Sequence, residues 1–281
     1  MEIQKRVAAI HDISGFGKCS LTVALPVISA AGIETSVIPT AVLSTHTGGL
    51  DGYTCRDLTD DMEPFYKHWK SLGLKFDAVY SGYLGSQRQI DIVCDIIDAF
   101  RTDRSFALVD PAMADNGKMY ALFDMQFAKA MKRLCKKADI IVPNMTEACF
   151  LLEQDYTSGP YEKSYIERLI RELSDLGPQR VVLTGVSFDK ATVGAASYDR
   201  NENRVEYFFK DRIDGMFHGT GDVFASALTA ALVRGKSLSA ATNIAVCFTV
   251  DSIKRTADGG TDHRYGVDFE RGLSDFIKAL E

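Results

Sequence analysis

The sequence of 281 residues lacks the features of a secreted, membrane-spanning or nucleic-acid-binding protein. No apolar run approaches the roughly 20 residues needed to cross a bilayer, and the N-terminus shows no charged segment followed by an apolar one. The six cysteines lie far apart without a CxxC pair. A formal net charge of −6 gives no broad basic surface for nucleic acid or anionic membrane. We therefore expect a cytoplasmic protein with reduced thiols and small-molecule ligands.

The common nucleotide-binding signatures are absent as well. The sequence contains no GxxxxGK[ST] loop, and no GxGxxG follows a predicted strand. Its five histidines are not spaced like zinc ligands. A P-loop, a dinucleotide site and a zinc site are therefore disfavoured.

What the sequence does contain is an alternation of short β-branched runs with longer helical patterns, which is typical of a mostly parallel sheet covered by helices. Apolar residues recur at helical spacing from Ile90 to Phe100 and from Ile166 to Leu176. A turn from Asp199 to Asn203 predicts an antiparallel hairpin at one sheet edge. We expect one α/β domain over residues 1–281, with strands at 6–10, 35–39, 78–81, 106–110, 140–143, 181–184, 192–197 and 205–209.

Polar residues stand at the expected carboxyl ends of five of these strands. Open α/β sheets bind ligands beyond those ends, so one cleft is expected to collect these residues. Taken singly, each has a structural explanation, such as a turn at Asp110 before Pro111. The set comprises His11 and Asp12, Ser81 and Gly82, Asp110, Asn144, and Thr184.

The most informative stretch is His218 to Asp222, followed by apolar residues at helical spacing. The spacing predicts a helix with Asp222 in its first turn and two glycines that leave backbone amides free. Free N–H groups at a helix start attract phosphate, and a carboxylate there suits proton removal from an attacking hydroxyl. The alternative is a glycine turn whose acidic residue merely favours the helix dipole.

A second motif, Asn144 to Glu147, fits a helix capping box. Glu147 also suits a Mg²⁺ site, since Mg²⁺ keeps several waters and takes one or two carboxylates. The two roles do not exclude each other.

Three segments together resemble the vitamin kinases of the ribokinase superfamily. HGTGDVFASAL, from His218, contains the GTGD signature of the superfamily, and SGYLG, from Ser81, resembles the same segment of pyridoxal kinases. DPAMADNGKMY, from Asp110, is similar to the DPVMGDxGxLY segment of those enzymes. The resemblance covers nearly the full length. It implies a three-layer αβα sandwich and ATP-dependent phosphorylation of the 5′-hydroxymethyl group of pyridoxal, pyridoxine or pyridoxamine.

The resemblance also implies how the substrate is held and activated. Asp222 would be the base for the substrate hydroxyl, and the amides of Gly219, Thr220 and Gly221 would hold the charge that develops on the transferred phosphate. Tyr83 would lie against the pyridine ring, although ordinary packing is its alternative role. Further substrate contacts are implied for Asp12, Ser14, His46 and Thr47, the last two from a run similar to the SNHT segment of pyridoxal kinases; His46 has the alternative of a loop histidine with satisfied hydrogen bonds.

For ATP and its metal, the resemblance points to a second group of residues. Asp110 and Glu147 are the expected Mg²⁺ ligands on charge grounds. The segment 112–119 is expected to fold over the ATP phosphates as a lid. Dependence on a monovalent cation such as K⁺ is left open, and a homodimer is expected. The implied ATP contacts are Asp110, Asn144, Glu147, Thr184, His218, Gly219 and Gly221.

Two departures from the family pattern bear on substrate choice. The loop from His11 to Ser20 is shorter than in pyridoxal kinases and is closer to the SDxSGGAG loop of hydroxymethylpyrimidine kinases. Whether Asp12 or Ser14 meets the substrate ring therefore stays open. Asp222 stands where some hydroxymethylpyrimidine kinase relatives that accept pyridoxal have a cysteine.

Two other functions are compatible with the sequence. One is phosphorylation of hydroxymethylpyrimidine or a sugar on the same fold, and the other is non-catalytic binding of nucleotide or vitamer. Tyr83 in its SGYLG segment favours a flat heterocycle over a sugar. A carboxylate kept beside a phosphate, as at Asp222, favours turnover over mere binding.

Overall fold

The computed structural model describes residues 4–281, and the contacts within the chain divide it into two compact units. The first unit combines the N-terminal part up to Tyr80 with Ile213–Glu281, and the second is Ser81–Arg212. The expectation that the chain forms one domain stays a prediction.

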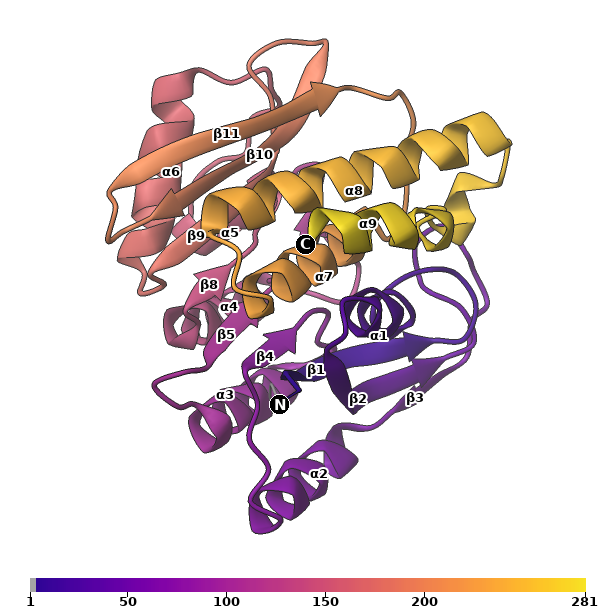
Figure 1. Cartoon of the computed structure of the whole chain (residues 1–281), viewed down its shortest axis with the longest axis vertical. Helices are drawn as coiled ribbons and strands as arrows, with labels where there is room; N and C mark the ends of the chain where they lie inside the picture. Colours follow the sequence, from indigo (N-terminus) through magenta and orange to yellow (C-terminus); the bar gives the residue numbers. More distant parts are fainter. Residues whose placement is uncertain (1–3) are drawn as a thin grey trace. The chain divides into compact units, whose positions relative to one another are not determined.

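The first unit carries the strand order β4-β1-β2-β3. Its elements are β1 (Arg6–Ser14), α1 (Leu21–Ala30), β2 (Glu34–Leu43), β3 (Cys55–Asp57), α2 (Thr59–Ser71), β4 (Ala78–Ser81), α7 (Thr220–Val233), α8 (Leu238–Gly259), the 3₁₀ helices η1 (His263–Tyr265) and η2 (Glu270–Gly272), and α9 (Leu273–Ala279). β1 pairs in parallel with β2, whereas β3 is antiparallel to β2. Helix α1 packs on β1 and β2, and α7 lies against both α1 and α8 (Figure 1).

The sequence explains the centre of this unit. The run Val7 to Ile10 is fully buried, as expected for a parallel strand covered on both faces. The buried positions of α7 are mostly small, including Ala225, Ala227, Ala230 and Ala231. Small side chains permit close packing of α7 against its helical neighbours. The start of α7, which carries the predicted base, is therefore held on a tightly packed helix.

The second unit carries the strand order β11-β10-β9-β8-β5 and a separate two-stranded sheet, β6-β7. Its elements are α3 (Gln87–Phe100), β5 (Phe106–Val109), β6 (Ala114–Asp115), β7 (Lys118–Met119), α4 (Met125–Lys137), β8 (Ile140–Ile141), α5 (Met145–Leu152), α6 (Lys163–Asp175), β9 (Arg180–Val186), β10 (Thr192–Asp199) and β11 (Arg204–Asp211). β5, β8 and β9 are parallel, and β10 and β11 complete an antiparallel edge. Helices α3 to α6 contact one another in succession.

The predicted fold class, a mostly parallel sheet with helices and an antiparallel edge, is confirmed. Each of the eight expected strands is present, and the turn at 199–203 joins β10 to β11. Three short strands were missed, namely β3, β6 and β7. They span only two or three residues and are largely exposed, so the sequence has no apolar run that would predict them.

Two boundaries correct the sequence analysis. β1 continues to Ser14, so His11 and Asp12 lie inside the strand and not beyond its end. The β1 to β2 register shifts between His11 and Ile13, and such irregularities re-aim side chains. Helix α7 begins at Thr220, so Gly221 is a helical residue and only Gly219 belongs to the turn before it.

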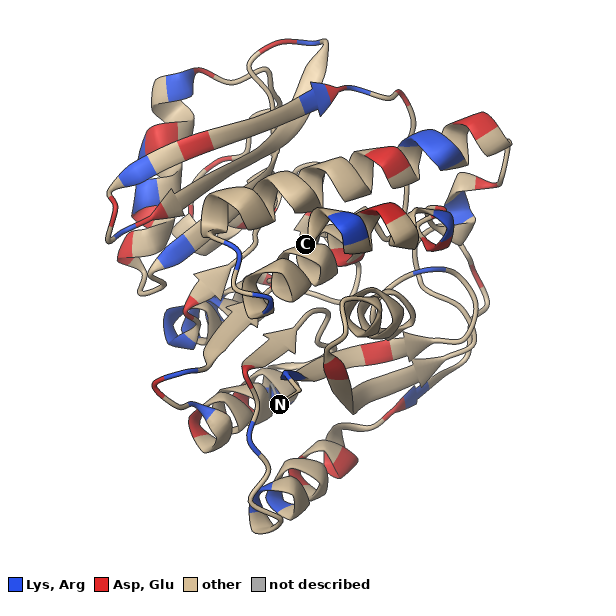
Figure 2. Cartoon of the chain, in the orientation of Figure 1, with Lys and Arg blue, Asp and Glu red and all other residues tan. Residues whose placement is uncertain are grey.

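The surface helices differ in charge, because α4 carries only basic charged residues. Acidic and basic residues are mixed along α6, and α9 carries one of each, Asp275 and Lys278 (Figure 2). Single-sign patches suited to nucleic acid are therefore not a feature of α6 and α9. No helix within residues 4–281 is long and apolar enough to span a membrane.

Candidate active site

The first group of predicted site residues surrounds the start of α7. Asp222 lies in the first turn, and the N-cap residue Gly219 has no side chain to satisfy the first N–H groups. Asp222 is half-buried. Burial raises its pKa to about 7, the neighbouring Asp12 carboxylate raises it as well, and the nearby backbone N–H of Ser20 opposes both. A carboxyl group that titrates near neutrality is suited to accept a proton from an alcohol.

Gly219 is required by the approach of another segment. Its φ is 74°, in the left-handed region, and a Cβ at this position would lie 2.0 Å from the carbonyl oxygen of Lys18. The loop that follows β1 therefore runs directly over the start of α7. Thr220 donates its hydroxyl hydrogen to the carbonyl of Phe217 at 3.4 Å, which helps to close the turn.

The Asp12 carboxyl is buried beside this loop. The hydroxyl of Ser14 donates to Asp12 Oδ2 at 3.1 Å, and both residues are almost fully buried. Burial raises the pKa of Asp12, while the nearby hydroxyls of Ser20 and Ser14 and the proximity of His46 lower it. Asp12 and Ser14 are thus hydrogen-bonded to each other, and the charge of Asp12 raises the pKa of Asp222.

The loop after β2 places His46 against the C-terminal part of the same unit. Its Nε2 lies 2.5 Å from the carbonyl oxygen of Arg264, and its Nδ1 accepts the N–H of Gly48 at 3.1 Å. Both ring nitrogens are therefore engaged, which matches the alternative of a loop histidine with satisfied hydrogen bonds. The His218 ring lies 5.4 Å from the His46 ring, while Thr47 is exposed.

In the second unit, Asp110 follows β5 and Glu147 lies in the first turn of α5. Both side chains are buried. Burial raises the pKa of Glu147 well above its ordinary value, and the Asp110 carboxylate raises it further, whereas backbone N–H donors lower it. No group of three or more His, Cys, Asp or Glu side chains in residues 4–281 is placed to hold a metal. Two buried carboxyl groups close together are of the ligand type that Mg²⁺ takes alongside water.

The capping box predicted at the start of α5 is present. Asn144 Oδ1 accepts the N–H of Glu147 at 2.9 Å, and Glu147 Oε2 accepts the N–H of Asn144 at 2.8 Å. Thr184 pairs with this segment through a bridge to Asn144 and donates its own N–H to Pro143 at 3.0 Å. In addition, Asp110 donates its N–H to the carbonyl of Ser81 at 2.9 Å. The predicted neighbours at these strand ends are thus together within the second unit.

The expected lid segment forms the β6–β7 hairpin. Its turn residues Asn116 and Gly117 both have positive φ, 49° and 76°, as a tight hairpin turn requires. The N-terminus of α5 holds this hairpin at three places. Asn144 Nδ2 donates to the carbonyl of Ala114 at 2.8 Å, Thr146 Oγ1 accepts the Gly117 N–H at 3.0 Å, and Glu147 Oε1 accepts the Met113 N–H at 3.1 Å. Thr146 was not anticipated from the sequence, which carries no motif for this contact.

Tyr83 lies within an aromatic cluster of the second unit. Its half-buried ring is 5.5 Å from the ring of Phe123, which stacks on Phe127 at 3.8 Å. Phe123 thus backs Tyr83 as a second aromatic surface. The only sequence signal for this role of Phe123 is that the residue is apolar.

Comparison with known proteins decides the family. A profile described as phosphomethylpyrimidine kinase matches residues 27–266, which is most of the chain. The chain belongs to the phosphomethylpyrimidine kinase family. The predicted membership of the vitamin kinase branch of the ribokinase superfamily is thereby confirmed, and members of this family are kinases.

Solved structures of this family share the fold. A candidate phosphomethylpyrimidine kinase from Bacteroides thetaiotaomicron, crystallised with pyridoxal, is 39% identical with a TM-score of 0.93 and covers 98% of this chain and 96% of its own. Pyridoxal kinase from Lactobacillus plantarum is 29% identical with a TM-score of 0.89, covering 99% and 98% of the two chains.

The sequence relatives include both a pyridoxal kinase and a hydroxymethylpyrimidine/phosphomethylpyrimidine kinase. Human pyridoxal kinase is 29% identical over 255 residues, which are 82% of this chain and 78% of the human protein. The hydroxymethylpyrimidine/phosphomethylpyrimidine kinase of Bacillus subtilis is 28% identical over 203 residues, 68% of each protein. Identity to these two members of the family therefore does not rank the two substrates.

Substituting Gly219→Ala tests the close approach at the start of α7. The left-handed φ alone costs about 1–2 kcal/mol for a residue with a Cβ, and the clash with the Lys18 carbonyl adds to this. Gly235→Ala is the matched control, because Gly235 also has positive φ but no atom within 4 Å of a built Cβ. In urea unfolding we expect Gly219→Ala to lose clearly more stability than Gly235→Ala. Equal losses would mean that the loop does not press on Gly219.

Proposed function

We propose that this kinase transfers the γ-phosphoryl group of ATP to the 5′-hydroxymethyl group of a B6 vitamer, namely pyridoxal, pyridoxine or pyridoxamine. The observation that carries the proposal is the Asp222 carboxyl at the start of α7, with a pKa of about 7. Phosphoryl transfer demands mainly positioning and charge stabilisation, so one well-aimed base suffices.

Asp222 takes the proton of the vitamer hydroxyl as that oxygen attacks phosphorus. The N–H groups of Gly219, Thr220 and Gly221 at the helix start then offer hydrogen bonds to the phosphoryl oxygens. Gly219 allows the loop after β1 to lie against this helix start, because a Cβ there would be 2.0 Å from the Lys18 carbonyl oxygen. His218 belongs to the same segment and is assigned to the nucleotide.

The nucleotide is assigned to the residues at the strand ends of the second unit. Asp110 and Glu147 would hold Mg²⁺, which would neutralise charge on the ATP phosphates. Asn144 and Thr184 keep these acids in place through the capping box and the strand bridge. The hairpin 114–119 serves as the lid, and its anchoring by Thr146 limits its opening.

An aromatic surface in the second unit favours a B6 vitamer over other alcohols as the substrate. Tyr83, backed by Phe123, suits a flat pyridine ring better than a sugar. Pyridoxal in the Bacteroides structure gives the same indication for a relative. In this assignment Asp12, whose carboxylate accepts the Ser14 hydroxyl, contacts the polar groups of the ring. Thr47 contacts the ring from the loop after β2. The dimer, the monovalent cation and the cytoplasmic location stay predictions.

A coupled ATP-consumption assay over five alcohols tests the substrate. The panel consists of pyridoxal, pyridoxine, pyridoxamine, hydroxymethylpyrimidine and ribose. We expect a B6 vitamer to give the highest kcat/KM. A first rank for hydroxymethylpyrimidine would establish the alternative kinase, and no consumption with any alcohol would support a binding protein.

The pH dependence of kcat/KM tests Asp222 as the base. Only the ionised carboxylate accepts a proton, so kcat/KM should fall by about tenfold per pH unit below a midpoint of about 7. A profile that stays flat from pH 8 to pH 5 would contradict the assignment.

The companion variant is Asp222→Asn, which keeps the shape and removes the charge. It should abolish phosphorylation, leave ATP binding intact and raise the unfolding midpoint at pH 8, because burial disfavours the charged form in the folded state. Because the Asp222 pKa is raised in the folded state, the free energy of unfolding of wild type should decrease as pH rises from about 4 to 7. The variant should lack this decrease. Near-normal turnover of the variant would remove Asp222 from the mechanism.

Glu147→Gln tests the metal assignment. With one carboxylate removed, the Mg²⁺ concentration that half-saturates nucleotide binding should rise by an order of magnitude or so. Isothermal titration of ATP at fixed Mg²⁺ concentrations measures this without turnover. Ser86→Ala, which removes the N-cap hydrogen bond of α3, controls for loss of a helix cap and should leave the Mg²⁺ titration unchanged. An unchanged titration for Glu147→Gln would favour a purely capping role.

A further inference from the structure

Phe123 lies where two features assigned to different ligands meet. It stands in the chain between the β6–β7 hairpin, the expected lid over ATP, and Asp124, the N-cap residue of α4. Its half-buried ring lies 5.5 Å from the Tyr83 ring, with an angle of 35° between the two planes. The residue therefore contacts the aromatic surface assigned to the alcohol and belongs to the connection that leaves the hairpin.

Main-chain hydrogen bonds tie Phe123 to the stem of the hairpin, which Met113 and Tyr120 form. Tyr120 donates its N–H to the carbonyl of Met113 at 3.0 Å, and Phe123 donates its N–H to the carbonyl of Tyr120, also at 3.0 Å. Met113 is fully buried and donates its own N–H to Glu147 Oε1 at 3.1 Å. A series of hydrogen-bonded residues therefore runs from Glu147, which is assigned to the metal, to the main chain of Phe123.

Neighbouring rings fix the orientation of the Phe123 ring. Phe127, in the first turn of α4, stacks on it with the ring centroids 3.8 Å apart and the planes 3° from parallel. Phe127 itself is buried, and the Tyr120 ring of the hairpin stem lies 6.3 Å from Phe123. Aromatic rings whose centroids lie within about 7 Å of each other interact favourably. A movement of the stem that displaces Phe123 therefore changes its contact with Tyr83.

We propose that Phe123 is a positioning residue that couples the Tyr83 surface to the lid, so that closure of the hairpin over nucleotide fixes the Tyr83 ring for the alcohol. The inference rests on the proposed function, because it takes Tyr83 as the surface for the pyridine ring and the hairpin as the lid over ATP. Such coupling is reciprocal, so nucleotide and alcohol should each tighten the binding of the other by the same factor.

The physical basis of the coupling is the order of the Tyr83 ring. Nucleotide that holds the hairpin closed orders the stem, and the stem orders Phe123 through the Tyr120 carbonyl. The alcohol then meets a Tyr83 ring whose orientation is already restricted, so less conformational freedom is lost when it binds. The Phe123 ring is the only part of this arrangement that the coupling requires and the hairpin fold does not.

The test is isothermal titration of the protein with pyridoxine, with and without β,γ-methylene-ATP and Mg²⁺. This analogue does not transfer its terminal phosphoryl group, so binding is measured without turnover. In wild type we expect the analogue to lower the Kd for pyridoxine at least about fivefold, and pyridoxine to lower the Kd for the analogue by the same factor. A Kd for pyridoxine that the analogue leaves unchanged in wild type would overturn the inference.

Two variants separate the ring of Phe123 from its place in the chain. Phe123→Leu keeps an apolar side chain and the main-chain hydrogen bond to Tyr120 but loses the ring contacts, so the coupling factor should fall to about one. Phe123→Tyr keeps a ring and should retain the coupling of wild type. A wild-type coupling factor in Phe123→Leu would contradict the inference.

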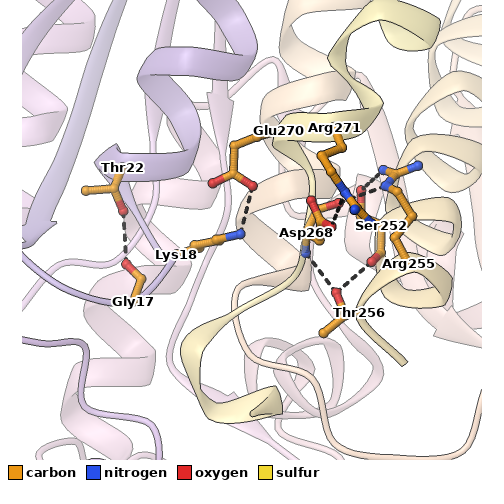
Figure 3. Close-up of polar contacts among 9 residues, drawn as sticks. All are labelled: Gly17, Lys18, Thr22, Ser252, Arg255, Thr256, Asp268, Glu270 and Arg271. Atoms are coloured by element: carbon orange, nitrogen blue, oxygen red, sulfur yellow. Dashed lines mark hydrogen bonds and ion pairs between the residues drawn. The ribbon is translucent and has the colours of Figure 1, made fainter. Parts of the chain in front are cut away.

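Thr256→Val in the first unit controls for a mere loss of stability. Thr256 Oγ1 accepts the N–H of Asp268 and donates to the carbonyl of Ser252, both at 2.8 Å (Figure 3). Valine lacks both hydrogen bonds, so this variant should have a lower Tm with the ring contacts of Phe123 intact. Its coupling factor should equal that of wild type. A factor reduced as far as in Phe123→Leu would attribute the loss to stability and overturn the inference.

A double-mutant cycle with Tyr83→Leu tests whether Phe123 acts through Tyr83. If it does, Phe123→Leu should change the Kd for pyridoxine much less in the Tyr83→Leu background than in wild type. Additive effects of the two substitutions would refute action through Tyr83.

Failure of this inference is distinguishable from failure of the proposed function. If wild type neither binds nor phosphorylates a B6 vitamer, the proposed function itself falls. If wild type phosphorylates pyridoxine and Phe123→Leu keeps the full coupling, only the role of Phe123 is refuted.

Discussion

The energetic cost of burying the Asp222 carboxylate is the constraint on which the site depends. Raising its pKa from an ordinary value of 3.8 to about 7 corresponds to roughly 4 kcal/mol at most against the charged form. A protein with a typical net stability of about 5–15 kcal/mol tolerates this only if the rest of the fold compensates. Burial of the mostly small side chains of α7 is one stabilising contribution that the first unit makes.

The second pair of acids faces the same difficulty and meets it differently. Glu147 and Asp110 are buried close together, yet Glu147 accepts the backbone N–H groups of Asn144 and Met113. Backbone donors are fixed in place, so they stabilise charge without ordering further side chains. The same hydrogen bonds connect the acid pair to the β6–β7 hairpin, which makes one helix N-terminus responsible for both features.

Periodicity and motif spacing were sufficient for the long elements and for the start of α7, because apolar spacing and the GTGD signature are local properties. The short strands β3, β6 and β7 were not predicted because their residues show no apolar pattern. The capping box was predictable from Asn144 and Glu147, whose spacing is its signature. The contact of Thr146 with the Gly117 N–H was not, since a side-chain acceptor is specified by tertiary approach and leaves no trace in sequence spacing. His46 shows the converse: its position was noticed, but only coordinates reveal that both ring nitrogens already have partners.

The close passage of the Lys18 carbonyl over Gly219 also bears on how this family can diverge. Two segments far apart in the sequence share a gap too narrow for a methyl group. Any lineage that acquires a chiral residue at the glycine must first retract the loop from the start of α7. Evolutionary drift in the two segments should therefore be correlated, with changes in one tolerated only alongside changes in the other.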